Sequence, residues 1–140
     1  MNMIIDAKDT VLGRLATFAA KKALLGESVD VINSEKAVII GRKEVILAKY
    51  KQRRARGGPH TGPYILRSPE RLVKRTIRGM LPHKQEKGEL ALKKVRCYNG
   101  IPQSCVGKEA VTLENAKLCD RHMRYITVKQ LALELGHKDA

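Results

Sequence analysis

The first 56 residues alternate between short segments rich in β-branched residues and longer segments with helical periodicity. Residues 3–6, 29–33 and 37–40 have the composition of strands. Apolar residues recur at helical spacing over residues 12–23, and a second helical segment covers residues 42–56. Strands that alternate with helices in this way predict a layered α/β domain with parallel strands joined by right-handed crossovers.

Residues that start and stop helices flank the first helical segment. Asp9 and Thr10 precede it directly, and both residue types favour the N-cap position. Gly26 follows it at the position where a glycine commonly ends a helix. We therefore expect a helix that begins after Thr10 and ends before Gly26.

The second half of the chain predicts fewer regular elements. Residues 57–68 contain three glycines and two prolines, which predicts a loop with a restricted backbone. Residues 85–94 predict a helix, and residues 95–98 predict a final short strand. Near the end of the chain, Thr127 and Gln130 form a capping-box pattern, so we expect a C-terminal helix to begin there.

A further helix is expected between the loop and Pro82. Ser68 is a favourable N-cap and Pro69 suits the first helical position. Pro82 should stop the helix, because proline cannot continue one. The expected apolar face consists of Leu72, Val73, Ile77 and Met80.

Positive charge is concentrated in the middle third of the chain. The protein has 140 residues and a formal net charge of +14, from 28 basic and 14 acidic residues. Residues 49–96 hold 15 basic and three acidic residues, whereas residues 1–48 and 97–140 each have a net charge of +1. An excess confined to one region predicts a binding surface for a polyanion, with nucleic acid favoured over an anionic membrane.

Four cations share one stripe of the helix that follows Ser68. Arg71, Lys74, Arg75 and Arg78 fall within about 100° of the helix circumference. Like charges at these spacings repel each other, so the free helix gains no stability from the stripe. A helix that lies against phosphates gains from each cation and from the counterions that it releases. The stripe therefore predicts a nucleic-acid contact.

A second group of cations ends the helix of residues 42–56 and leads into the glycine-rich loop. The group consists of Lys49, Lys51, Arg53, Arg54 and Arg56. Glycines allow the backbone amides of such a loop to approach a sugar-phosphate chain closely, while the adjoining arginines supply charge. This combination predicts a second RNA or DNA contact.

We find no pattern that indicates a catalytic, cofactor or metal site. The segment from Gly100 to Lys108 differs from a phosphate-binding loop in its glycine spacing and in the residue that follows the lysine. Cys119 and His122 could touch on a helix, but two ligands do not make a zinc site. No carboxylate pair stands out for acid–base chemistry. We therefore expect no enzyme activity, no cofactor and no small-molecule substrate.

The location of the protein is predicted from its apolar runs and its cysteines. The longest apolar runs are only a few residues, far short of the ~18 needed to cross a membrane. Three cysteines are too few for a disulfide framework, which fits a reducing cytosol. We expect a cytoplasmic protein that does not bind membranes.

Several segments together resemble one known family. Residues 77–82, followed after five residues by Gly88 and then by residues 95–100, closely resemble the signature of large-subunit ribosomal protein L13. Residues 6–17 resemble the N-terminus of that family, and residues 33–44 resemble its second conserved landmark. Cys97 is a mild departure from the pattern at an apolar position.

The extent of the resemblance suggests one branch of the family. It covers about residues 3–102 and is looser over residues 103–140, where we expect a helical tail within the same single domain, residues 1–140. Residues 54–84 are similar to the archaeal and eukaryotic branch, and the long basic extension of eukaryotic members is absent. We therefore expect an archaeal member.

The resemblance implies a three-layer α/β/α fold around a small, mainly parallel sheet of four strands. It also implies a component of the large ribosomal subunit that binds large-subunit rRNA, supports assembly of the subunit and contacts neighbouring ribosomal proteins. The family's basic loop falls on residues 53–61 and its Gly-Met-Leu-Pro turn on residues 79–82. The predicted RNA-binding residues are Lys49, Lys51, Arg53, Arg54, Arg56, Gly57, Gly58, His60, Thr61, Arg67, Arg71, Lys74, Arg75, Arg78, Gly79, His83 and Lys84.

Two other classes of protein remain alternatives at this stage. An RNA-modifying enzyme of this size would need a cofactor loop and acid–base residues. A free nucleic-acid-binding or membrane-surface protein would bind its target independently of ribosomes.

Overall fold

The centre of the protein is a parallel sheet of four strands. The computed structural model describes residues 2–122 and 124–138. The strands are β1 (Asn2–Asp6), β2 (Ser28–Ile32), β4 (Val95–Cys97) and β5 (Val111–Thr112). Their order is β4-β2-β1-β5 and every pairing is parallel, which confirms the expected α/β class with its small parallel sheet.

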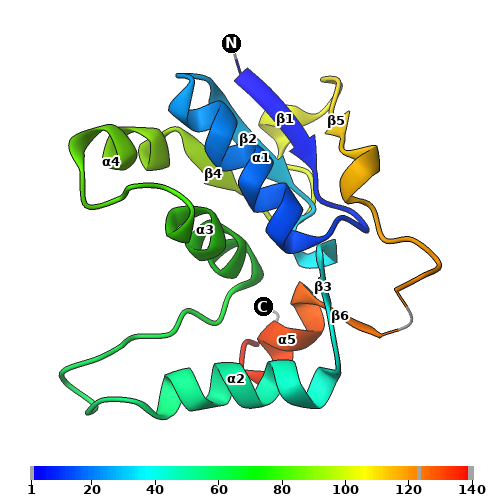
Figure 1. Ribbon diagram of the computed structural model, residues 1–140. Coiled ribbons are helices and arrows are strands. Elements are labelled where there is room, and N and C mark those ends of the chain that lie inside the picture. The colour runs from blue at the N-terminus through cyan, green and yellow to red at the C-terminus, as the bar shows by residue number, and fades with distance from the viewer. Residues whose placement is uncertain (1, 123, 139–140) are drawn as a thin grey trace.

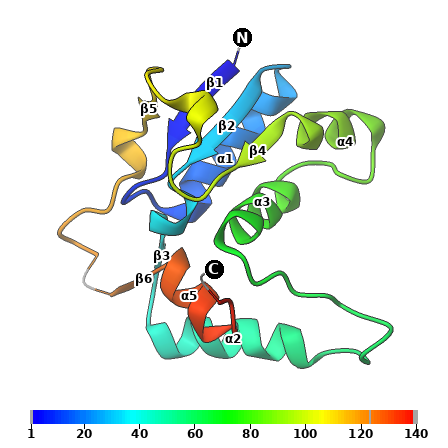
Figure 2. The same ribbon diagram turned by 180° about the vertical axis from the view of Figure 1, so that it is seen from behind.

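Alternate residues of β1 face opposite sides of this sheet. Ile5 is fully buried in the main core, which helix α1 covers (Figure 1). Ile4 belongs to a second, smaller cluster with Ile32 and Cys105. Cys105 lies in the short 3-10 turn Gln103–Cys105, which covers the other face of the sheet (Figure 2). The sheet is therefore the middle of three layers.

Helix α1 (Leu12–Leu24) buries its leucine and alanine face as its periodicity predicts. It ends at Gly26, where the amide of Glu27 reaches back to the carbonyl of Lys22. The predicted N-cap is wrong, because the capping position is taken by Val11 without a side-chain hydrogen bond. Thr10 is fully buried, and its hydroxyl instead donates to backbone carbonyls that precede the helix.

Helices α3 (Pro69–Gly79) and α4 (Glu86–Lys93) follow the long loop. Ser68 and Pro69 take the predicted N-cap and N1 positions, although the Ser68 side chain makes no capping hydrogen bond. Three of the four predicted apolar residues are buried, but Met80 is 43% exposed because α3 ends before it. α3 packs against α1 and β4, so its polar face points outward.

The third predicted strand does not join the parallel sheet. β3 (Val38–Ile40) pairs antiparallel with β6 (Tyr125–Thr127) and forms a separate two-stranded sheet. Both β5 and β6 follow residues 95–98, so the prediction that these residues form the last strand is wrong. The tail thus contains strands as well as its predicted helix.

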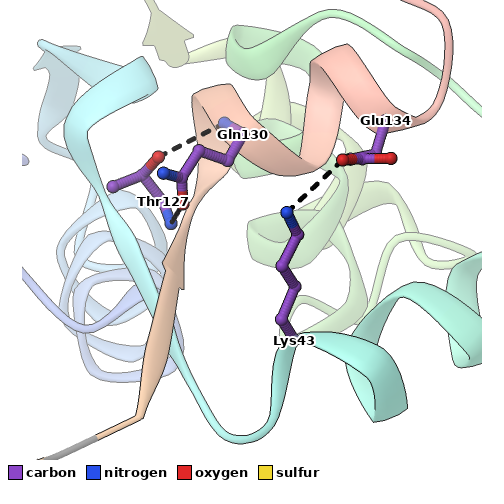
Figure 3. Close-up of polar contacts among 4 residues, drawn as sticks. All are labelled: Lys43, Thr127, Gln130 and Glu134. Carbon is purple, nitrogen blue, oxygen red and sulfur yellow. Dashed lines mark hydrogen bonds and ion pairs between the residues drawn. The ribbon is translucent and has the colours of Figure 1, made fainter.

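Helices α2 (Lys43–Ala55) and α5 (Val128–Glu134) form the end of the molecule opposite the sheet (Figures 1 and 2). The predicted capping box is present: the Gln130 amide donates to the Thr127 hydroxyl over 3.2 Å, and the Thr127 amide donates to the Gln130 side chain (Figure 3). Lys43 pairs with Glu134 over 3.4 Å and links the two helices (Figure 3). α2 buries only Ile46, so most of its surface is available to solvent.

Candidate nucleic-acid interface

Helices α2 and α3 line the two sides of a groove, and the segment that joins them forms part of its wall. The groove has a volume of about 730 Å³ and is lined by residues of both helices. Its cations come from both predicted basic groups. They are Lys49, Arg53 and Arg56 from the α2 side and Arg75 and Arg78 from α3.

Only part of the cationic stripe on α3 lines the groove; the stripe consists of Arg71, Lys74, Arg75 and Arg78. Arg75 and Arg78 line the groove, and Gly79 lies beside them. Arg71 is exposed outside it. Lys74 is half-buried and lies near Cys97 of β4. Burial raises the pKa of the Cys97 thiol to about 12, and the positive charge of Lys74 opposes that rise.

The α2 cations are also divided. Arg53 lies over the Tyr50 ring, 5.6 Å from its centroid. Burial raises the pKa of Tyr50, and the neighbouring Arg53 charge acts in the opposite direction. Lys51 is exposed outside the groove. Arg54 points away from it and donates to the carbonyl of Leu135, at the end of α5, over 3.0 Å.

The glycine-rich loop is folded back on itself. A Cβ at Gly57 would overlap the Gly62 carbonyl, so only glycine allows this close approach. The Gly58 amide donates to the Thr61 hydroxyl over 3.1 Å, so this amide is already used within the loop. The Tyr64 hydroxyl donates to the His60 carbonyl over 2.8 Å.

A second hollow of about 500 Å³ adjoins the groove and shares Arg56, Pro63, Tyr64 and Ile65 with it. Arg54, Arg56 and Arg67 contribute cations to it, and Gly57 and Gly58 contribute backbone. The loop and the residues that flank it therefore border two basic hollows. The remaining predicted residues, His83 and Lys84, lie in the turn after α3 and line neither hollow.

The cations of the groove are not neutralised by the protein. Within residues 2–122 and 124–138, the ion pairs are Lys22–Glu27, Lys43–Glu134 and Lys93–Glu89. None of them uses a cation of α3 or of the basic end of α2. Clustered like charges without carboxylate partners repel each other, and a bound polyanion relieves that repulsion.

Sequence reasoning missed the apolar part of the groove. Tyr50, Tyr64, Ile65, Leu66 and Leu72 line it together with the cations. The chain has four tyrosines, one phenylalanine and no tryptophan, and two of the four tyrosines lie here. The available signal was Tyr50, which stands one turn before the arginines at the end of α2.

Other kinds of site find little support in the part of the chain that the structure describes. No group of three or more His, Cys, Asp or Glu side chains there could hold a metal ion. Cys119 and His122 do touch, with 3.3 Å between Sγ and Nδ1, but they lie in a turn and not on a helix. None of the described helices is long and apolar enough to cross a membrane.

Comparison with known proteins gives a consistent result. The family model described as Ribosomal protein L13 matches residues 1–104. A protein of Archaeoglobus fulgidus is 40% identical over 137 residues, which cover 96% of this chain and 88% of that protein. Relatives from Methanosarcina barkeri and Thermoplasma volcanium are 38% and 39% identical, cover 96% and 95% of this chain, and align over 98% and 97% of their own lengths. All three are named large ribosomal subunit protein uL13.

Proposed function

Because the chain belongs to the ribosomal protein L13 family, we propose that it binds large-subunit rRNA through the α2–α3 groove and the adjoining loop. It is a protein of the large ribosomal subunit, located in the cytoplasmic ribosome. Its archaeal relatives are named as ribosomal subunit proteins and not as enzymes, which agrees with the prediction that the chain has no catalytic role. Its role in the proposal is to support assembly of the subunit beside neighbouring ribosomal proteins.

The observation that carries this proposal is the meeting of two basic groups that lie far apart in sequence. Arg53 and Arg56 reach the groove from one side, and Arg75 and Arg78 reach it from the other. Arginine suits phosphate because its planar guanidinium can donate two parallel hydrogen bonds. Four arginines around one concave surface therefore support a contact with a folded RNA backbone.

Titration of structured rRNA fragments at increasing salt tests the proposal. We expect affinity to fall steeply, because each neutralised phosphate releases counterions. Arg75→Ala and Arg78→Ala should each weaken binding and reduce the slope of log K against log salt by about 1. Lys138→Ala, an exposed change that lines neither hollow, should leave the slope nearly unaltered.

Cosedimentation of the protein with the large subunit is a second test of the proposal. The protein should remain with the large subunit through a high-salt wash, because an rRNA contact within an assembled particle is held by many groups together. A flat salt dependence, or release of the protein at moderate salt, contradicts the proposal.

A further inference from the structure

We propose that the α2–α3 groove holds one unstacked nucleotide of the bound RNA, with its base against Tyr64 and the apolar wall and its phosphates on the arginines. This inference rests on the proposed function and specifies the RNA structure that the groove recognises. It predicts that the protein prefers RNA with a looped-out base to a continuous duplex.

The first argument is that the groove has two chemically different parts. Its cations suit phosphates, but Ile65, Leu66 and Leu72 offer no hydrogen bond to a backbone. A continuous duplex presents phosphates and sugars outward and keeps its bases stacked inside. An unstacked base has an apolar face, so a nucleotide complements both parts of the groove at once.

The second argument is the state of Tyr64. Tyr64 is 73% exposed, so its ring is accessible to a base. Its hydroxyl is fixed to the His60 carbonyl, and its ring packs over Gly62. In the closed loop the ring therefore already lies where a base of the bound RNA would stack on it.

The third argument is size. The groove volume of 730 Å³ lies within the range of about 300–1,000 Å³ that is typical of clefts for small ligands. A nucleotide is a ligand of this class, whereas a double helix is too wide to enter such a cleft. Arg53 and Arg75 lie beside this space, and guanidinium planes also stack on bases.

The experiment compares two RNA hairpins that differ by one nucleotide. One is fully paired, and the other carries a single bulged adenosine in the middle of the same stem. Stacking of one base on an aromatic side chain contributes about 1–3 kcal/mol, so the full chain should bind the bulged hairpin roughly 5- to 150-fold more tightly. Each affinity is measured at the same salt concentration.

Three variants separate stacking from charge and from folding. Tyr64→Ala should reduce the affinity ratio of the bulged to the paired hairpin to about 1. Tyr64→Phe keeps the ring and loses only the hydroxyl, so it should retain most of the preference. Arg71→Ala, whose side chain lies outside the groove, should weaken binding of both hairpins by the same factor.

The outcomes distinguish this inference from the proposed function. Equal and salt-dependent binding of the two hairpins overturns the nucleotide pocket and leaves the proposed rRNA contact standing. A preference that survives Tyr64→Ala, in a variant whose melting temperature is unchanged, also overturns it. Failure to bind either hairpin at low salt overturns the proposed function itself and the pocket with it.

Discussion

Gly88 allows two backbone segments to pack closely together because it has no side chain. This glycine lies inside helix α4, where glycine is otherwise unfavourable by roughly 1 kcal/mol relative to alanine. The structure supplies the reason for it, because a Cβ at this position would overlap the carbonyl of Pro82. The turn after α3 therefore packs directly against the backbone of α4.

Gly88→Ala should destabilise the protein even though alanine favours helices. Relief of the overlap requires the turn at Pro82 to move, and overpacking of this kind costs about 1–3 kcal/mol. Gly13→Ala is the matched control, since Gly13 is also helical and has open space around its Cβ position. Thermal melting should show a fall for the first variant and an unchanged or slightly higher midpoint for the second. Equal midpoints would mean that the turn adapts without cost.

Cys97 predicts a loss of stability at alkaline pH. Burial raises the pKa of its thiol from 9.0 to about 12, so the folded state keeps a proton that the unfolded state releases first. Above pH 9 the unfolded chain therefore binds fewer protons, and the free energy of unfolding should fall as pH rises toward 12.

Urea unfolding of the wild type and of Cys97→Ala, at several pH values between 8 and 11, measures this contribution. All other groups are the same in the two proteins, so the difference between their pH dependences isolates Cys97. The wild type should lose stability more steeply than the variant. Parallel curves for the two proteins would show that the thiol ionises equally well in the folded state.

Elements that the sequence predicted correctly are those whose signals are local. Helix α1 follows the spacing of its buried leucines and alanines, and α5 follows its capping box. β5 was missed because it has only two residues, Val111 and Thr112, and both are exposed. The pairing of β3 was missed because its partner β6 lies more than 80 residues away, and a run of β-branched residues does not specify its partner.

The candidate site was likewise predicted where its signals are local in sequence and missed where they depend on the tertiary structure. The basic groups and the loop were predicted from local composition, and the structure brings part of each group to one groove. The apolar wall was not predicted, since it depends on how α2 and α3 are placed relative to each other. Arg54 shows the same limit, because nothing in its neighbourhood in sequence indicates that it reaches Leu135.

Arg54 connects helix α2 to helix α5, and this gives it a role in stability that its neighbours lack. Arg54→Ala removes its hydrogen bond to the Leu135 carbonyl, a contact of about 0.5–1.5 kcal/mol. Because α2 buries only Ile46, that loss is a sizeable part of what holds the helix. We expect a lower melting temperature and faster amide exchange along α2.

Lys51→Ala is the control for this effect, since Lys51 is exposed on the same helix and makes no hydrogen bond or ion pair within the described residues. Both variants lose one positive charge, so both should weaken RNA binding through charge alone. Only Arg54→Ala should also change the exchange rates of α2. The same exchange rates in both variants would show that Arg54 does not anchor the helix.

The residues that stabilise the fold and the residues that are proposed to bind RNA lie in different parts of the molecule. The core lies around the parallel sheet with α1 and α3, whereas the charge excess of residues 49–96 is displayed on the outer side of α3, on α2 and on the loop between them. Residues 51–61 are all exposed. This arrangement keeps the mutual repulsion of the cations outside the core, and it leaves the loop dependent on RNA for further contacts.

Limited proteolysis tests this dependence on the scale of the whole particle. The loop is held by local bonds such as those from Gly58 to Thr61 and from Tyr64 to His60, so it should open easily in the free protein. Trypsin should then cleave first at Arg56, which is exposed at the start of the loop. In the large subunit the same bond should be protected, because the proposed rRNA contact covers the loop and supplies the order that the free chain lacks.

Raising the salt until the protein dissociates should restore cleavage, while an unrelated trypsin substrate in the same tube confirms that the protease stays active. Equal cleavage at Arg56 in the free protein and in the intact subunit would show that the loop does not contact RNA.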